Sequence, residues 1–176
     1  MRLKNKVCLI TGSSSGIGES IARSFKKEGA KVIITYNSNR KGASKVANSL
    51  KTDFFQLDVK NKKSVFNVFK KVHKKFKKID VVINNAGINI TNEFDKISEK
   101  DWDLVLDTNL KGVFFCCQAA IKHMKTKGKI INIGSLSGEY GGPRTPSYAA
   151  AKAGVMSLTH CLARFLGHKG INVNCL

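Results

Sequence analysis

Short apolar runs alternate along the chain with segments in which apolar residues recur every three or four positions. The first pattern predicts buried strands, and the second predicts amphipathic helices. The apolar runs hold few polar residues, which is typical of strands covered on both faces of a parallel sheet. Strands are predicted at residues 6–11, 31–36, 54–59, 80–84, 129–134 and 171–175, and helices at residues 17–28, 41–50, 60–78, 98–125 and 147–166.

The alternation of strand and helix continues through the whole chain. It requires right-handed crossovers between parallel strands and places helices on both faces of one sheet. We therefore predict an α/β fold with a doubly wound, Rossmann-like parallel sheet in the strand order 3-2-1-4-5-6. The length of 176 residues suits a single domain, residues 1–176.

Charge is the most unusual part of the composition, since 31 Lys and Arg residues against 12 Asp and Glu residues give a net charge of +19. Such a balance is typical of proteins that bind nucleic acids. Nine lysines, however, lie between Lys60 and Lys78 around an apolar stripe with helical spacing. The phenylalanines of that stripe face the core, where they cannot stack on bases. We interpret the lysines as a solvated helix face and predict no nucleic-acid partner; a nucleic-acid site is the alternative.

The cysteines and the apolar runs favour a cytoplasmic location. The five cysteines are an odd number without a C-x-x-C motif, and each lies in an apolar stretch, which predicts buried, reduced thiols. The longest apolar runs have fewer than ten residues, which predicts neither a membrane span nor a signal peptide. The four histidines lack the spacing of metal ligands, so we predict no metal site.

Three glycines follow the first predicted strand, in the segment Thr11-Gly-Ser-Ser-Ser-Gly-Ile-Gly18. Gly12 permits a tight turn, Gly16 lets a pyrophosphate approach the backbone at a helix N-terminus, and Gly18 lets that helix pack closely. Glycines are also common in plain turns between a strand and a helix. Because a strand precedes this triad and a helix follows it, dinucleotide binding is the favoured interpretation.

The residues after the second strand distinguish NAD from NADP. An acidic residue there accepts a hydrogen bond from the adenosine 2′-hydroxyl of NAD and repels the 2′-phosphate of NADP. This chain has Tyr36 and Asn37 instead, followed by Arg40. The missing acid and the nearby arginine predict NADP(H), with NAD(H) less favoured. Alternatively, Arg40 is only the first residue of a helix that Ser38 or Asn39 caps.

Polar or small residues also end the third and fourth strands. Asp58 is placed to bind adenine with its carboxylate, or to cap a turn. Asn85, Ala86 and Gly87 suit a turn over which a ribose lies, although such segments are common turn signals in general. We take both segments as candidate parts of the nucleotide site.

Tyr148 and Lys152 share one face of a predicted helix because they are four residues apart. A free tyrosine has a pKa of about 10, too high for proton transfer at neutral pH, and an adjacent ammonium group stabilises a phenolate. Ser135 follows the fifth strand, so it faces the crevice at the carboxyl edge of the sheet. Each feature occurs by chance in many proteins, but beside a nucleotide-binding loop they favour catalysis.

These motifs resemble those of the short-chain dehydrogenase/reductase family, which shares T-G-x-x-x-G-x-G, N-N-A-G and Y-x-x-x-K in this order. The resemblance extends from Val7 to the last residue and is greatest to the 3-oxoacyl-[acyl-carrier-protein] reductases. It implies a catalytic tetrad of Asn109, Ser135, Tyr148 and Lys152, in which Asn109 breaks its helix and holds a water. It also implies a cofactor site made of Gly12, Ser14, Ser15, Gly16, Ile17, Gly18, Tyr36, Asn37, Arg40, Asp58, Val59, Asn85, Ala86, Gly87, Tyr148 and Lys152.

The resemblance implies an NADPH-dependent oxidoreductase that reduces a 3-oxoacyl thioester to the 3-hydroxyacyl product in fatty acid biosynthesis. Ser135 would bind the carbonyl oxygen, Tyr148 would donate the proton, and Lys152 would bind the nicotinamide ribose. The enzyme would be a cytoplasmic homotetramer acting on a small-molecule thioester or one bound to acyl carrier protein. Because such carriers are acidic, Lys127 and Lys169 are candidate contacts at the active-site end.

Two departures from the family pattern leave alternatives open. Residues 141–147 read Gly-Gly-Pro-Arg-Thr-Pro-Ser, where those reductases have a Gly-Gln-x-Asn pattern before the tyrosine. A sugar, a polyol or a small ketone is therefore an alternative substrate. Family members are longer, so we expect a C-terminal strand and a substrate lid to be missing from residues 1–176. A catalytically inactive nucleotide-binding fragment is the other alternative.

Overall fold

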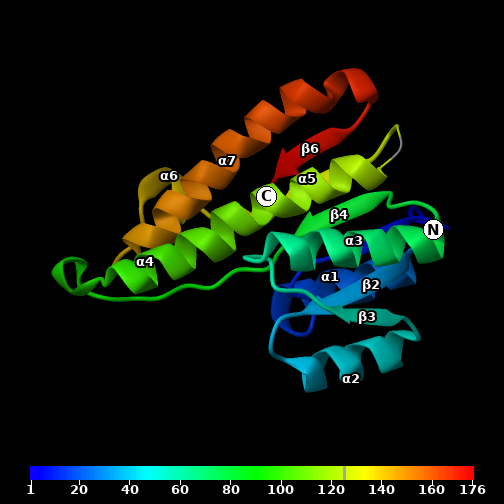
Figure 1. The fold of residues 1–176 in the computed structure, drawn as a ribbon, viewed down its shortest axis with the longest axis horizontal. Helices are drawn as coiled ribbons and strands as arrows, with labels where there is room; N and C mark the ends of the chain where they lie inside the picture. The colour runs from blue at the N-terminus through cyan, green and yellow to red at the C-terminus, as the bar shows by residue number, and fades with distance from the viewer. Residues whose placement is uncertain (125) are drawn as a thin grey trace.

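The computed structural model describes residues 1–124 and 126–176, and its strands form one six-stranded parallel sheet (Figure 1). The strand order β3-β2-β1-β4-β5-β6 confirms the predicted doubly wound α/β fold. The strands are β1 (Val7–Ile10), β2 (Lys31–Tyr36), β3 (Asp53–Gln56), β4 (Val81–Asn84), β5 (Lys129–Asn132) and β6 (Asn172–Cys175). The α-helices are α1 (Gly16–Lys27), α2 (Arg40–Leu50), α3 (Lys62–Phe76), α4 (Glu99–Leu106), α5 (Gly112–His123), α6 (Ser137–Tyr140) and α7 (Pro146–Leu166).

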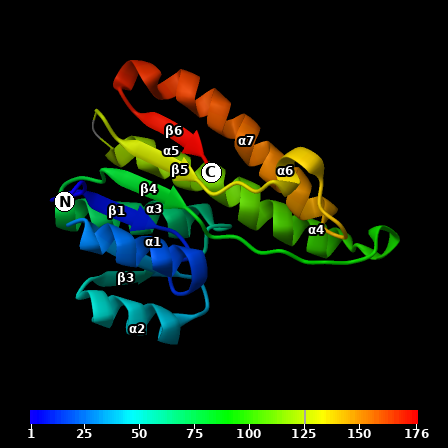
Figure 2. The ribbon, with the colours of Figure 1, turned by 180° about the vertical axis from the view of Figure 1, so that it is seen from behind.

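Helices cover both faces of the sheet, as Figures 1 and 2 show from opposite sides. One core lies between the sheet and α3, α5 and α7, and it receives strand side chains such as Leu9 and Val82. The other core lies under α1 and α2 and receives the alternate side chains, such as Cys8 and Ile83. Because every β1 and β4 residue is buried on one face or the other, these strands show no polar alternation in the sequence.

Polar caps fix where several helices begin. The Asn39 side chain accepts a hydrogen bond from the Gly42 N–H at the start of α2. Ser98 Oγ accepts one from the Asp101 N–H at 3.1 Å at the start of α4. Each cap satisfies a backbone donor that the helix itself leaves unpaired, so these helices start at defined residues.

The lysine-rich helix α3 has the predicted arrangement. Val65, Val68, Phe69 and Val72 are buried against the sheet, while Lys62, Lys63, Lys70, Lys71, Lys74 and Lys75 on the outer side of the helix are exposed. The lysines therefore form a solvated face, as the spacing of the apolar residues indicates.

The third strand is shorter than predicted. β3 ends at Gln56, which pairs with Tyr36, the last residue of β2. No residue of β2 continues past this point to pair with a longer β3. Leu57 and Val59 are buried in the loop instead, so their apolar character reflects packing and not strand pairing.

The single helix predicted at residues 98–125 is interrupted near its middle, so the prediction of one continuous helix was wrong. A π-helical turn, Asp107–Lys111, separates α4 from α5. The apolar pattern runs through this turn without a break, whereas the family resemblance implied an interruption at Asn109. The predicted end at Lys125 lies outside the described residues.

Two cysteines and two lysines lie where the prediction did not place them. Cys161 is exposed and Cys175 only half-buried, whereas Cys8, Cys116 and Cys117 are buried as predicted. Cys161 lies two residues beyond the buried Thr159, about 200° around α7, and therefore faces outward. Lys127 and Lys169 lie in the turns just before β5 and β6, so they lie at the amino edge of the sheet and not at the carboxyl edge that the prediction required.

The α4–α5 stretch, Glu99–His123, is 25 residues long and apolar enough to cross a membrane by length and composition. Half of the most apolar 18-residue window of this stretch is buried within the protein. Its contacts with α3, α7 and the sheet account for that burial, so the stretch carries no membrane inference.

Candidate functional site

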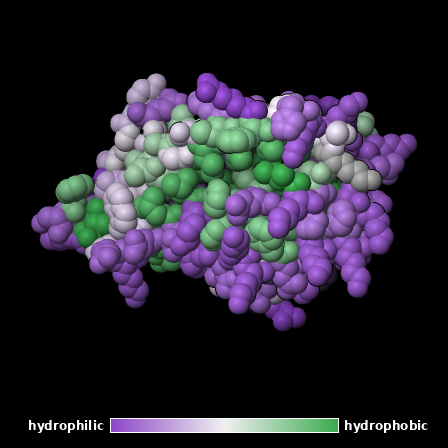
Figure 3. Space-filling model, turned by 45° about the horizontal axis from the view of Figure 1, so that its top comes forward, coloured by the Kyte–Doolittle hydropathy of each residue, from purple (hydrophilic) through white to green (hydrophobic). Residues whose placement is uncertain are grey.

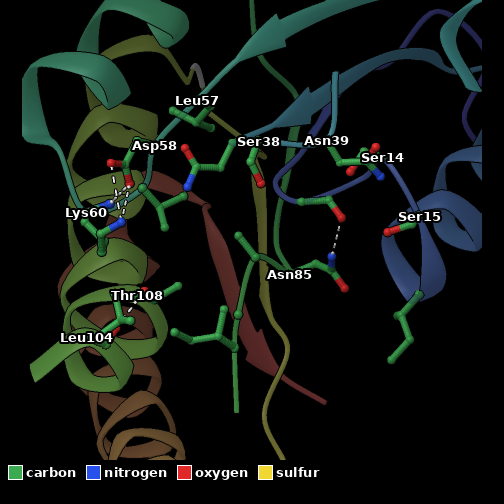
Figure 4. A pocket seen from close by; sticks show the side chains of 17 residues that line it. Ser14, Ser15, Ser38, Asn39, Leu57, Asp58, Lys60, Asn85, Leu104 and Thr108 are labelled. Carbon is green, nitrogen blue, oxygen red and sulfur yellow. Dashed lines mark hydrogen bonds and ion pairs between the residues drawn. The ribbon is translucent and has the colours of Figure 1, made fainter. Parts of the chain in front are cut away.

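The loops after β1, β2, β3 and β4 enclose a cavity of about 530 Å³ (Figure 4). It lies at the carboxyl edge of the sheet, where doubly wound folds bind their ligands. One wall comes from α4 and the π-helical turn. The lining residues are Gly12, Ser14, Ser15, Ile17, Asn37, Ser38, Asn39, Leu57, Asp58, Val59, Lys60, Asn85, Ala86, Gly87, Ile88, Leu104 and Thr108.

The glycine loop has the backbone conformation that its glycines allow. Gly12 and Gly16 have φ angles of +63° and +58°, in the left-handed region. A Cβ on Gly18 would lie 2.6 Å from both Asn85 Nδ2 and Gly12 O, so glycine is needed for this close approach. Around Gly16, where α1 begins, no atom of the described residues lies within 4 Å of a Cβ position, apart from its chain neighbours and the backbone of its own helix. The helix N-terminus is therefore open to an anion such as a pyrophosphate.

Thr11 joins the glycine loop to the loop after β4. Its Oγ1 accepts hydrogen bonds from the backbone N–H groups of Asn85 and Ala86, both at 2.9 Å. Asn85 Nδ2 donates in return to Thr11 O at 2.9 Å. It also donates to Gly12 O at 3.1 Å (Figure 4). These bonds hold two walls of the cavity together, and no motif in the sequence singled out Thr11 for this role.

The end of β2 presents only uncharged polar residues to the cavity: Asn37, Ser38 and Asn39. Tyr36 points into the core beside Phe54, with ring centroids 6.0 Å apart, and does not line the cavity. Arg40 is the exposed first residue of α2, in agreement with the alternative interpretation of that arginine. The end of β2 therefore has no carboxylate that would repel a 2′-phosphate.

Asp58 lies across the cavity from these residues and is paired with Lys60. The Lys60 N–H donates to Asp58 Oδ1 at 3.0 Å, and the Lys60 Nζ lies 3.4 Å from the same oxygen. The prediction omitted Lys60, although it directly follows the predicted third strand, residues 54–59. The pair places one cation and one anion at the same wall of the cavity (Figure 4).

Asn109 is fully buried in the π-helical turn. Its Nδ2 donates to Ile88 O at 2.8 Å and to Val105 O at 2.9 Å, and its Oδ1 accepts from the Ile88 N–H at 3.3 Å. A Cβ on Gly87 would lie 2.5 Å from that Oδ1. The turn therefore fixes the loop after β4 along the cavity wall.

Lys152 is 4% exposed, and its Nζ lies 5.4 Å from the centroid of the Tyr148 ring. The Nζ donates a hydrogen bond to Ile133 O at 2.5 Å. Burial lowers the pKa of the Lys152 ammonium, an effect that the nearby Cys175 thiol partly offsets. The structure thus brings the predicted Tyr and Lys together on α7.

Ser135 lies between β5 and α6, on a segment that packs closely on α7. A Cβ on Gly138 would lie 2.9 Å from the Lys152 carbonyl carbon, so α6 contacts α7 at Lys152 itself. Ser135 Oγ accepts a hydrogen bond from the Ser137 N–H at 3.1 Å. On the other side, the Leu110 side chain would lie 2.8 Å from a Cβ on Gly154. Ser135 and Asn109 therefore lie on segments that contact α7, the helix that carries Tyr148 and Lys152.

The predicted cofactor residues divide into those that line the cavity and those that do not. Ten of them line it, whereas Gly16, Gly18, Tyr36, Arg40, Tyr148 and Lys152 do not. Seven lining residues were not predicted: Ser38, Asn39, Leu57, Lys60, Ile88, Leu104 and Thr108. Ser38, Asn39 and Lys60 follow strand ends and were open to prediction. Leu104 and Thr108 come from a helix and a π-helical turn, and nothing in the local sequence marks either residue as part of a ligand site.

Comparison with known proteins decides the family, because the short chain dehydrogenase model matches residues 6–176. The chain belongs to this family. Its membership makes it an NAD(P)-dependent oxidoreductase. It is 41% identical over 182 residues to the 3-oxoacyl-[acyl-carrier-protein] reductase FabG of Thermotoga maritima, covering 100% of this chain and 74% of that enzyme. It is 40% identical to the (2S)-[(R)-hydroxy(phenyl)methyl]succinyl-CoA dehydrogenase subunit BbsD of Thauera aromatica, covering 100% and 73%.

Solved structures of short-chain dehydrogenases have the same fold. A short chain dehydrogenase from Burkholderia cenocepacia in complex with NADP superposes with a TM-score of 0.96 at 34% identity, over 99% of this chain and 74% of that one. A blue fluorescent protein from a metagenomic library in complex with NADPH superposes with a TM-score of 0.94 at 31% identity, over 99% and 74%.

Proposed function

We propose that the protein binds NADPH in the cavity and reduces a 3-oxoacyl thioester to its 3-hydroxyacyl product. The observation that carries the chemistry is the buried Lys152 ammonium beside the Tyr148 ring, at the carboxyl edge of a sheet with an open glycine loop. The FabG relatives support a carrier-bound 3-oxoacyl thioester as the substrate. The BbsD relative, named for a CoA thioester, supports the thioester class more broadly.

The residues of the cavity fit a dinucleotide with a 2′-phosphate. The open N-terminus of α1 offers backbone N–H groups to the pyrophosphate. Asn37, Ser38 and Asn39 offer polar groups without a negative charge at the adenosine end. Two structural neighbours carry NADP or NADPH, which supports the same cofactor here. Bound NADPH supplies the hydride for the reduction.

The proton chemistry falls to the four tetrad residues. Ser135 donates a hydrogen bond to the carbonyl oxygen and orients it. Tyr148 donates its hydroxyl proton to the oxygen as negative charge develops there. Lys152 stabilises the resulting phenolate and binds the nicotinamide ribose with its remaining N–H groups. Asn109 fixes the π-helical turn through its bonds to two backbone carbonyls. We assign to this turn the water that returns a proton to the site, as the family resemblance implies.

An assay across substrate classes tests this function. Acetoacetyl thioesters of carrier protein and coenzyme A, a small ketone, a sugar and a polyol are each supplied to the protein with NADP(H) and with NAD(H). We expect NADPH consumption to be fastest with an acetoacetyl thioester. Faster turnover of a sugar, polyol or small ketone would replace the proposed substrate but retain the oxidoreductase. No turnover of any substrate by a folded, NADPH-binding protein would support the inactive fragment.

The cofactor preference is tested by Asn37→Asp, which introduces a carboxylate at the adenosine end of the cavity. The unmodified protein should have a higher kcat/KM for NADPH than for NADH. The new charge should repel the 2′-phosphate and shift that ratio toward NADH by about tenfold, about 1.4 kcal/mol. Asn67→Asp, an exposed position on α3, adds the same charge away from the cavity and should leave the ratio unchanged. Equal kcat/KM values for both cofactors in the unmodified protein would contradict the NADP assignment.

A homotetramer in the cytoplasm completes the proposal. Figure 3 shows apolar side chains gathered in a band on one face of the molecule. Phe114 of α5 and Phe165 of α7 are 40% and 73% exposed. Exposed apolar area of this kind favours an interface with a second copy. Free thiols suit the reducing cytoplasm, and the positive charge suits an acidic carrier.

Light scattering tests the assembly. The unmodified protein should have the mass of four chains. Phe165→Asp puts a charge at an exposed apolar position of α7 and should reduce that mass, because an unpaired charge is costly to bury in an interface. His168→Asp, exposed in the turn after α7, is the control and should leave the mass unchanged. A monomeric unmodified protein would rule out the homotetramer.

A further inference from the structure

Three buried polar side chains connect two strands of the sheet to helix α7. Asn84 Nδ2 at the end of β4 donates to Asn132 Oδ1 at the end of β5, at 2.8 Å. Asn132 Nδ2 donates to Thr159 Oγ1 on α7 at 2.9 Å. Their exposed fractions are 3%, 0% and 3%. We call these three side chains the amide ladder.

The direction of every hydrogen bond in the amide ladder is determined. The Thr159 hydroxyl donates its proton to Val155 O at 2.7 Å, so its oxygen is left to accept from Asn132. The Asn132 amide must then turn its nitrogen toward Thr159 and its oxygen toward Asn84. Asn132 and Thr159 have one arrangement that pairs them both, whereas the buried Asn84 Oδ1 has no hydrogen-bond partner among the described residues. A rotation or shift of α7 would break the bond between Asn132 and Thr159.

The amide ladder lies within the core beside Cys117 and Val155: Asn84 Nδ2 is 3.4 Å from Cys117 Sγ, and Val155 supplies the carbonyl that Thr159 bonds. Buried amides and hydroxyls add little net stability compared with well-packed apolar side chains, and they cost free energy when a partner is lost. A core that needed only cohesion would be expected to use Val or Leu at such positions. The ladder therefore indicates a requirement for one particular placement of α7 on the sheet.

The same helix carries the catalytic pair. Lys152 precedes Thr159 by seven residues, about two helical turns, so both side chains lie on one side of α7. Lys152 Nζ donates to Ile133 O, and Ile133 directly follows Asn132 on the chain. One short segment of β5 and its loop thus holds α7 at two points, Thr159 and Lys152.

At its other end the amide ladder adjoins the nucleotide cavity. Asn84 directly precedes Asn85, whose side chain bonds to the backbone of the glycine loop at Thr11 and Gly12. The ladder therefore forms a continuous hydrogen-bonded link from the loop after β4 to α7. The two parts of the proposed site, cavity and catalytic pair, are related through it.

We propose that Asn84, Asn132 and Thr159 are positioning residues that set the place of the Lys152 ammonium relative to Tyr148 and the nucleotide. The inference rests on the proposed function for its kinetic readout. Without the Thr159 hydroxyl, α7 remains in the apolar core but loses one of its two directional contacts with β5 and its loop. Lys152 then occupies a wider range of positions and binds both the phenolate and the ribose less well.

Thr159→Val tests the proposal, because it removes the hydroxyl and keeps a branched side chain. We expect kcat with the acetoacetyl thioester to fall about tenfold, corresponding to about 1.4 kcal/mol in the barrier. The alkaline limb of the pH profile of kcat should move to higher pH, because a displaced ammonium stabilises the phenolate less. The Kd for NADPH, measured by nucleotide fluorescence without substrate, should rise severalfold.

Two matched variants separate positioning from loss of stability. Thr159→Ser retains the hydroxyl and should restore kcat, the pH profile and the NADPH Kd, even at a reduced Tm. Leu166→Val removes buried apolar volume from the same helix and should lower Tm with no change in the pH profile or Kd. A Thr159→Val protein with an unchanged pH profile and Kd would overturn the proposal.

The remaining outcomes are also decisive. Failure of Thr159→Val to fold, while Thr159→Ser and Leu166→Val fold, would make the amide ladder a folding requirement and overturn the positioning role. Absence of turnover in the unmodified protein would refute the proposed function and not the ladder. The positioning role of the amide ladder is then tested by the NADPH Kd of the three variants, a measurement that needs no substrate.

Discussion

Replacing Tyr148 with Phe is expected to reduce thioester-dependent NADPH oxidation by about a hundredfold or more, the usual range for loss of a general acid. The ring stays in place over Lys152, whose Nζ is 5.4 Å from its centroid, so packing changes little. Only the hydroxyl proposed to protonate the product oxygen is lost. Steady-state kinetics should show the loss in kcat, while fluorescence titration should show NADPH binding close to normal.

A second tyrosine supplies the control for this experiment. Tyr140 is 83% exposed at the end of α6, the short helix that packs on α7. Tyr140→Phe makes the same chemical change close to the site and should leave kcat within about twofold of normal. Near-normal turnover in Tyr148→Phe would show that the proton comes from another group, and the tetrad assignment would then be wrong.

The buried strands were predictable because their physical signal is local. The run Val7–Ile10 is apolar throughout because each residue packs into one of the two cores. The second strand, Lys31–Tyr36, has the predicted bounds, since a glycine turn precedes it and polar residues follow. The strand order then follows from the general rules of right-handed crossovers.

Burial without strand pairing accounts for the errors in the third strand and in the cofactor residues. Leu57 and Val59 have strand-like side chains but line the cavity from a loop. Tyr36 is polar enough to suggest a ligand contact, yet its ring packs on Phe54. The local sequence shows only that such residues are apolar or aromatic. What packs against them depends on the assembled sheet.

The parts of the site that were not predicted depend on contacts between distant segments. Thr11 receives hydrogen bonds from residues more than seventy positions away, at the loop after β4. Asn132 and Thr159 come together only when α7 packs on β5. Asn, Thr and Ser are ordinary residues at strand and helix ends, so their pattern along the chain carries no sign of these bonds.

Replacing Lys152 with Met is expected to make the protein more stable and catalytically inactive. Lys152 is 4% exposed, and the described residues place no carboxylate beside its ammonium. A buried charge with one carbonyl partner costs free energy that an apolar side chain of similar length avoids. We expect the free energy of unfolding to rise by about 1 kcal/mol, or 2–4 °C in Tm for a domain of this size, when nucleotide is absent.

The pH dependence of this stability difference identifies its cause. Burial lowers the pKa of Lys152 in the folded protein, so as pH rises the folded state releases this proton before the unfolded state does. The unfolded state then binds more protons, and the stability of the unmodified protein rises relative to Lys152→Met. The Tm difference between the two should therefore be largest near neutral pH and shrink toward about pH 10, the usual pKa of lysine.

Lys63→Met is the control, because Lys63 is exposed on α3 and its replacement should change Tm little at either pH. NADPH should raise the Tm of the unmodified protein more than that of Lys152→Met, since the ammonium is proposed to bind the ribose and a ligand stabilises the state that it binds. A Lys152→Met protein that is less stable at neutral pH would show that the hydrogen bond to Ile133 outweighs the cost of burial. The lysine would then support the fold as well as the chemistry, and its place in the core would need no catalytic explanation.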